Sequence, residues 1–316
     1  MPADAANQQG GQTGQGPLND PGWLAAGAAG LVSACLCLWA FRGYPLGPAF
    51  FWLAPLPLFM AGIGFGAGAA VGAIGIGALV LFLSGPPIGL WVFVLAFAVP
   101  AAILSAAAHR EGGLGLPLAL LGILPAAGIA GAALYLADSP GGLEGVLQRM
   151  ARTGLRRFDL AGHAGLVSDI VRVKAAALGF WLALAWVANA WAAGKLLDRA
   201  GVASAPAWST ARLPGWYPIL PALALGLWLA ADEGGDAIEL SLLLVLLTPL
   251  LLHGLAVLHT RTRGRGERPL VLGALYVALV ILFLPTSLAV AGYAAFDLIA
   301  RRPPSTPGGR AAPPST

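Results

Sequence analysis

Long apolar runs alternate with short polar or Gly/Pro-rich breaks between residues 23 and 300. Most runs hold roughly 16–23 residues, the length at which an α-helix crosses the ~30 Å hydrocarbon core of a bilayer. They predict spanning helices at 23–41, in two halves of 49–83 divided near Gly64–Gly66, and at 88–108, 114–136, 175–193, 216–231 and 237–258. The pattern therefore predicts an all-α, polytopic transmembrane helical bundle.

The last apolar stretch, 269–300, is long for one span and short for two. Pro285 lies in its middle and lacks the N–H that a continuous helix needs there, so we expect a kink or a break. The prediction is about nine spans, with eight to ten allowed. Basic residues fall in similar numbers on both sides of such a bundle, so the positive-inside rule leaves the orientation of the termini open.

Composition supports the same class. The chain is 58% hydrophobic and 10% charged, whereas soluble domains carry about 25% charged residues. So few charges cannot cover a water-exposed surface, which excludes an ordinary soluble enzyme. Segments 1–22 and 301–316 are rich in Gly, Pro and small polar residues and are expected to be disordered tails. Between them we expect a first helix group at 23–137, a connector at 138–174 and a second group at 175–300.

The connector contains a predicted amphipathic helix at 142–158. Its apolar face holds Leu143, Leu147, Met150 and Phe158. Its opposite face holds Arg149, Arg152 and Arg156. Two interpretations stay open: an interfacial helix whose arginines reach lipid headgroups, or a connector packed on the membrane domain.

A glycine stripe runs through the second apolar stretch. Gly64, Gly68 and Gly72 recur at every fourth residue. This spacing removes side chains from one helix face and predicts close packing against a neighbouring helix. The same segment resembles a phosphate-binding loop only superficially, because no strand precedes it, so nucleotide binding is not expected.

A few polar residues beside the apolar helices are the candidate ligand or ion contacts. Asp236 precedes the helix at 237–258 and can cap its N-terminus. Glu239 is the foremost candidate contact for a cation or an amine, since ionisable groups in a membrane are costly. Asn189 and His253 either bond between helices or line a polar cavity. The sequence has no metal-ligand spacing and no nucleophile with its base, so no catalytic residue, metal or cofactor is predicted, and the chain is not expected to be an enzyme.

Short motifs spread along the apolar region carry a family resemblance. They are Trp52–Leu58 with Gly62, Gly64, Gly66 and Gly68; Asn189–Ala190; Leu196–Leu197 with Arg199 and Gly201; Arg212–Pro214 with Trp216; Pro249; Gly254–Val257 with His259; and Asp297 before Arg301–Arg302. This pattern resembles the YybS-like family of predicted bacterial membrane proteins of unknown function. The resemblance implies a multi-pass protein of the bacterial cytoplasmic (inner) membrane and implies no particular activity or ligand.

The Gly-rich hairpin within 49–83 also resembles the S components of energy-coupling-factor transporters. That similarity implies a membrane-embedded small-molecule binding or uptake subunit. The chain has no Walker A sequence, so ATP-driven uptake requires a separate ATPase or another membrane subunit. The lipid bilayer is the other expected partner. Nucleic acid is not, because no segment combines a dense basic run with exposed aromatic residues.

The alternative is a cell-envelope structural or assembly protein without transport activity. It is supported by the lack of an evident intramembrane charge pair and by the basic amphipathic segment. A deep polar cavity lined by Asn189, His253 or Glu239 favours the binding subunit, whereas a solid apolar interior favours the structural protein.

Overall fold

The computed structural model describes residues 20–111, 113–156, 164–204, 211–232 and 235–300, and every regular element in these segments is a helix. The N-terminal helices are α1 (Pro21–Phe41), α2 (Gly47–Leu53), α3 (Pro55–Phe65), α4 (Ala67–Ser84), α5 (Pro87–Val92), the π-helical η2 (Phe93–Ala98) and α6 (Val99–Glu111). The remaining helices are α7 (Gly115–Tyr135), α8 (Gly142–Arg156), α9 (Ala164–Arg199), α10 (Ile219–Ala230), α11 (Ala237–Arg261), α12 (Arg268–Ile281) and α13 (Phe283–Ala300).

The described helices include eight that are long and apolar enough to cross a membrane. α10 and α12, with 12 and 14 residues, are apolar but shorter. The expected all-α polytopic bundle of eight to ten spans is therefore confirmed. The protein belongs to the class of multi-pass membrane proteins.

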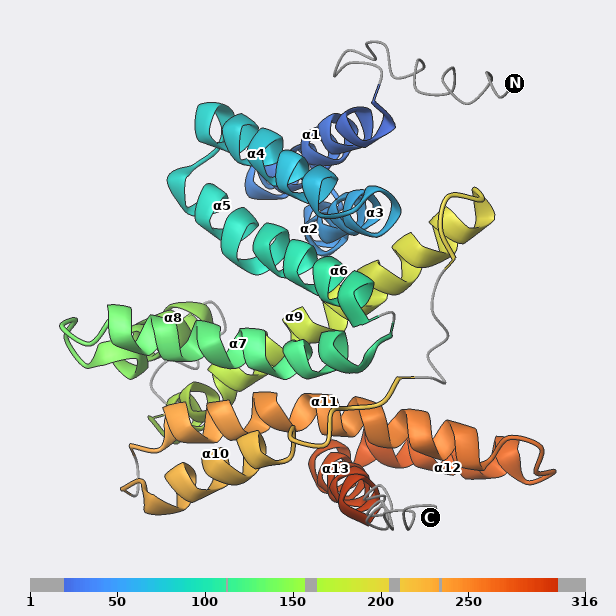
Figure 1. Ribbon diagram of the computed structural model, residues 1–316. Coiled ribbons are helices and arrows are strands. Elements are labelled where there is room, and N and C mark those ends of the chain that lie inside the picture. The colour runs from blue at the N-terminus through green and yellow to red at the C-terminus, as the bar shows by residue number, and fades with distance from the viewer. Residues whose placement is uncertain (1–19, 112, 157–163, 205–210, 233–234, 301–316) are drawn as a thin grey trace, which may run out of the picture.

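The bundle consists of two groups of helices joined by α9. Figure 1 shows α1–α6 on one side and α7, α8 and α10–α13 on the other, with α9 passing between them. α9 packs against α3 of the first group and against α7 and α11 of the second. The sequence placed α7 in the first group, but its most extensive packing is against α11. In the structure, α7 therefore packs mainly with the second group of helices.

Gly66 divides the long apolar stretch where the sequence predicted a division. Its φ of +85° and ψ of −174° are accessible to glycine and unfavourable for other residues, so the helix ends at Phe65 and restarts at Ala67. The glycine stripe is thereby split between two helices, which corrects the prediction of one packed face. Gly64 faces Leu197 of α9, Gly72 faces Ala26 of α1, and a side chain at Gly68 would enter open space.

The closest approach of α1 and α4 uses a different pair of glycines. A Cβ atom at Gly30 would lie 2.6 Å from the carbonyl oxygen of Ala73, and a Cβ atom at Gly77 would lie 3.1 Å from the carbonyl oxygen of Gly30. Neither distance is compatible with a relaxed contact. These two glycines, together with Gly72 of the predicted stripe, allow the two helices to pack closely.

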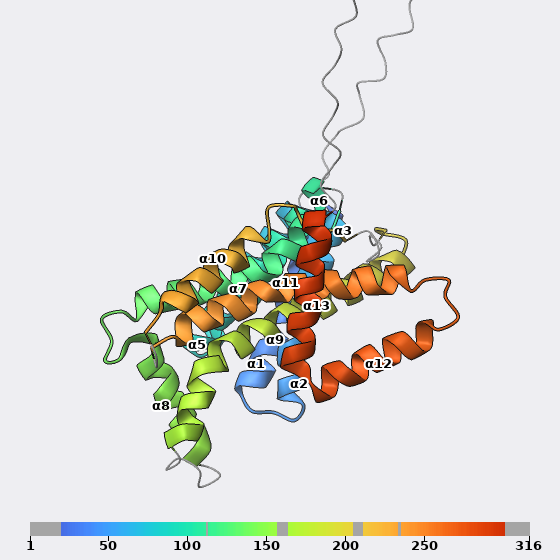
Figure 2. The same cartoon turned by 90° about the horizontal axis from the view of Figure 1, so that it is seen from below.

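The final apolar stretch is broken at Leu282, which has the non-helical dihedral angles φ −121° and ψ 55°. The break lies three residues before Pro285. In a continuous helix the proline ring would clash with the carbonyl group of Ile281, four residues earlier, and the break avoids this clash. Figure 2 shows that α13 leaves this point in a different direction from α12. The predicted break is confirmed. α12 packs against α13 and has no buried residue.

The connector is more helical than predicted. α9 begins at Ala164, so it includes the last part of 138–174 as well as the predicted span. α8 is the expected amphipathic helix, and its apolar residues Leu143, Leu147 and Ala151 are buried. They pack with Val167 and Val171 of α9, which are also buried.

This packing favours the connector interpretation of α8 over lipid insertion of its apolar face. Met150, which we placed on that face, is instead 52% exposed, and Phe158 lies outside the described residues. Arg149, Arg152 and Arg156 are exposed as expected, and Arg149 donates a hydrogen bond to the carbonyl of Pro140. Whether they meet lipid headgroups stays a prediction.

Candidate functional site

A cavity of about 770 Å³ lies between α3, α6, α7 and α9. This volume falls within the range of roughly 300–1,000 Å³ typical of small-molecule sites. α9 contributes the most side chains, among them Trp186, Ala190, Trp191 and Lys195, which stand at positions i, i+4, i+5 and i+9 of that helix. The cavity is therefore built where the two helix groups meet on α9.

One end of the cavity is buried and apolar. Phe59 of α3, Leu121 of α7 and Trp186 of α9 line it, and each is at most 4% exposed. The indole N–H of Trp186 donates a 2.8 Å hydrogen bond to the carbonyl of Ala96 in η2. This bond satisfies the only polar atom of the ring and fixes its orientation, so the indole offers the cavity a rigid aromatic wall.

The other end is open and polar. His109 lies in the last turn of α6, Lys195 lies in the last turns of α9, and Ser204 follows α9. All three are exposed. Among the described residues that line the cavity, His109 and Lys195 are the titratable ones and there is no carboxylate. The mouth is therefore basic.

Ser105 lies one helical turn deeper than His109. The carbonyl of Ser105 accepts a 2.8 Å hydrogen bond from Nδ1 of His109, and because a carbonyl only accepts, the proton is on Nδ1. The Ser105 side chain is 3% exposed, and its hydroxyl has no hydrogen-bond partner among the described residues. Gly62 of α3 faces this hydroxyl, since a Cβ atom there would lie 2.6 Å from Ser105 Oγ.

Asn189 lies beside this cavity without lining it. Its amide nitrogen donates 2.8 Å hydrogen bonds to the carbonyls of Trp52 in α2 and of Ala185 in α9. The residue is 4% exposed. Of the two interpretations left open by the sequence, the bond between helices is the one that the structure shows.

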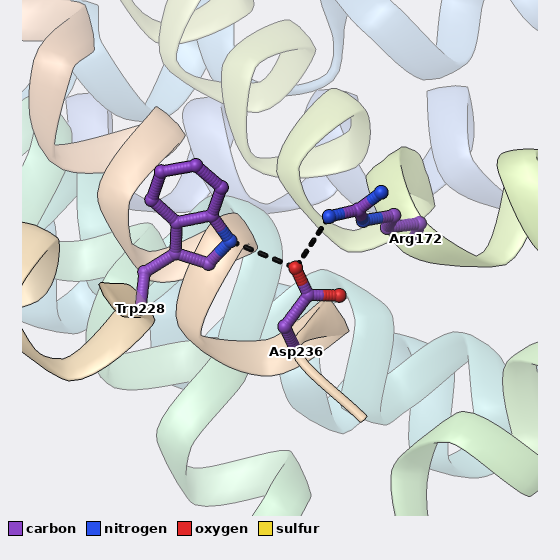
Figure 3. Close-up of polar contacts among 3 residues, drawn as sticks. All are labelled: Arg172, Trp228 and Asp236. Atoms are coloured by element: carbon purple, nitrogen blue, oxygen red, sulfur yellow. Dashed lines mark hydrogen bonds and ion pairs between the residues drawn. The ribbon is translucent and has the colours of Figure 1, made fainter. Parts of the chain in front are cut away.

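Asp236 takes part in a polar contact at the opposite end of α9 (Figure 3). Its Oδ2 accepts hydrogen bonds from Nη2 of Arg172 at 2.5 Å and from the indole N–H of Trp228 at 2.8 Å. Asp236 occupies the N-cap position of α11, but its side chain makes no capping hydrogen bond, which corrects that prediction. The carboxylate instead ties α9, α10 and α11 together.

The same contacts change the acidity of Asp236. The hydrogen bond from Arg172, followed by the one from Trp228, favours the charged carboxylate and holds its pKa below the usual value. Desolvation by burial acts in the opposite direction and is the smaller effect.

Glu239 and His253 do not line the cavity, and they do not join Asp236 in its hydrogen bonds. Glu239 lies in the first turn of α11 and is partly buried, and its Oε2 atom has no hydrogen-bond partner among the described residues. His253 is 3% exposed within α11. The four predicted contact residues are thus not brought together into one site.

A second ion pair joins the far ends of α11 and α13. Nη2 of Arg261 donates to Oδ1 of Asp297 at 2.7 Å, and the guanidinium lies 5.3 Å from the centroid of the Tyr293 ring. The sequence shows no evident intramembrane charge pair, and the described residues contain two ion pairs, one at the start of α11 and one at its end. Both partners of each pair lie far apart in sequence, so spacing alone could not reveal them.

Sequence reasoning also missed the residues that build the cavity. Trp186 and Ser105 resemble ordinary helix-packing residues, and nothing in their spacing distinguishes them. One signal was available for Lys195, because the chain has only two lysines and this one ends a long apolar run.

Comparisons with known protein families, with characterised proteins and with solved structures gave no match to this chain.

Proposed function

We propose that this protein is a membrane-embedded small-molecule-binding subunit, acting in uptake across the bacterial cytoplasmic membrane. The observation that carries the proposal is the cavity between α3, α6, α7 and α9. It combines a rigid aromatic wall with a small number of polar groups, the usual composition of a ligand site. The proposed role is binding and not catalysis.

The cavity differs from the one that we expected for this function. Its polar groups are Ser105, His109, Lys195 and Ser204, whereas Asn189, Glu239 and His253 do not line it. The interior is nevertheless not solid. The cavity therefore supports the binding subunit more than the cell-envelope structural protein.

Energy for uptake has to come from elsewhere. The chain carries no nucleotide-binding motif, so the proposed subunit depends on a separate ATPase or another membrane subunit, as its resemblance to S components implies. The exposed arginines of α8 are the feature that supports the alternative, an assembly protein whose loops recruit partners.

Native mass spectrometry of the detergent-purified protein tests the proposal. We expect a retained small molecule that Ala190→Phe displaces, because Ala190 lines the cavity and a phenyl group fills part of it. Ala188→Phe is the matched control, since Ala188 lies on the same helix and is exposed outside the cavity. A parent protein without bound mass, or equal retention in both variants, would contradict the proposal.

A further inference from the structure

We propose that the ligand of this cavity is an amphiphilic anion, with an apolar body between Phe59, Leu121 and Trp186 and one carboxylate or phosphate group at Lys195. This inference rests on the proposed function and names the chemical class of ligand that the same site takes.

The polarity of the cavity changes along its length. Phe59, Leu121 and Trp186 at the buried end expose no unsatisfied polar atom to it, because the indole N–H is bonded to Ala96. Lys195 and His109 both line the cavity and are both exposed. An apolar ligand would leave the basic end unused, and a small hydrophilic ion would leave the apolar end unfilled. A molecule with both parts matches the whole cavity.

The charge at the open end is uncompensated within the described chain. Lys195 forms no ion pair there, and no carboxylate lines the cavity. An ammonium group donates hydrogen bonds to a carboxylate or phosphate, and such charge-assisted bonds are stronger than neutral ones. α7 also begins at this end, and the N-terminus of a helix favours negative charge. A cationic ligand would be repelled.

The test uses undecanoic acid that carries a photoreactive diazirine, with the protein in phosphatidylcholine nanodiscs. The probe with a primary amide in place of the acid has nearly the same shape and no charge. After irradiation, peptide mass spectrometry measures saturable labelling of the α6 and α9 residues that line the cavity. We expect the acid to saturate these residues at a lower concentration than the amide.

The two lysines of the chain provide matched variants on α9. Lys195→Gln removes the charge at the cavity and is expected to raise the half-saturating concentration of the acid by roughly tenfold or more, the effect of losing one charge-assisted hydrogen bond. Lys174→Gln removes a charge outside the cavity and should change nothing. Ser105→Ala should leave thermal stability equal or higher, because it removes a buried hydroxyl without a hydrogen-bond partner among the described residues.

Equal affinity for acid and amide, or an unchanged half-saturating concentration in Lys195→Gln, would overturn the anionic assignment. A small molecule retained in native mass spectrometry would still support the proposed binding function in that case. Failure of the anionic assignment is therefore distinguishable from failure of the proposed function. An absence of saturable labelling in the cavity by either probe would also overturn the inference.

A free anion and a membrane phospholipid offer the same chemistry. Nanodiscs with added phosphatidylglycerol separate these sources. Displacement of the acid by this anionic lipid assigns the site to a lipid headgroup, and retention of the acid assigns it to a free amphiphile. Both results keep the proposed class of ligand.

Discussion

Asp236 shows how one side chain can join three helices. Its Oδ2 is shared between Arg172 of α9 and Trp228 of α10, while its backbone begins α11. Arg172 is half-exposed and Asp236 is buried. Water screens the ion pair from the arginine side, so the hydrogen bonds to the buried carboxylate are the more important part of the contact.

The lowered pKa of Asp236 predicts how stability depends on pH. A carboxyl whose pKa is lower in the folded state stabilises the fold above its unfolded pKa of about 3.9, and this stabilisation is lost as pH falls through the folded value. At pH 7 we expect Asp236→Asn to melt at a lower temperature than the parent, and the difference to shrink below about pH 4. Thermal melting in detergent over a pH series measures this.

Trp228→Phe is the matched variant for that series. It removes one hydrogen bond and should lower the melting temperature by roughly 2–4 °C at every pH above 4. A pH-independent difference between Asp236→Asn and the parent would show that the carboxylate charge does not stabilise the fold.

At the scale of helices, the contact between α1 and α4 depends on glycine. Gly30→Ala forces a methyl group against the carbonyl of Ala73, and we expect a loss of about 1–3 kcal/mol in the free energy of unfolding. Gly68→Ala is the control on α4. Its new methyl group meets open space, and alanine favours a helix by about 0.5–1 kcal/mol over glycine. Unfolding in mixed micelles with increasing dodecyl sulfate compares the two, and equal losses would contradict the packing described.

α8 offers a second test at this scale. Leu147 is buried against α9, so Leu147→Ala should cost about 2–5 kcal/mol of stability. Met150 on the same helix is 52% exposed, and Met150→Ala should change stability by less than about 0.5 kcal/mol. The same micelle unfolding assay measures both. If neither variant changes stability, α8 is not held on the bundle by its apolar face.

For the whole molecule, helix positions could be read from the sequence because lipid imposes a minimum length on apolar runs. Gly66 and Pro285 also marked breaks, since each restricts the backbone locally. The glycine stripe was wrong as a single packed face, because a four-residue spacing has meaning only along a continuous helix and Gly66 interrupts it. Gly64 and Gly72 still lie in close helix contacts, with α9 and α1 respectively.

The site could not be predicted in this way. The cavity exists because α3, α6, α7 and α9 do not fill the space between them, which is a property of tertiary packing. Asp236 and Arg172 are 64 residues apart, and no periodic pattern relates them. Polar residues stand out in an apolar sequence, but their partners are set by how the helices are arranged.

The contact between α7 and α11 has a consequence for biosynthesis. Gly122 has no side chain where Tyr217 and Pro249 pack against it, so this face of α7 is shaped for segments that emerge much later from the ribosome. At about 5–20 residues per second, Pro249 is synthesised roughly 6–25 s after Gly122. During that interval α7 is already made while its main partner is not. Until α11 arrives, we expect lipid to contact the notch at Gly122, and the pairing of α7 with α11 to follow the insertion of α7.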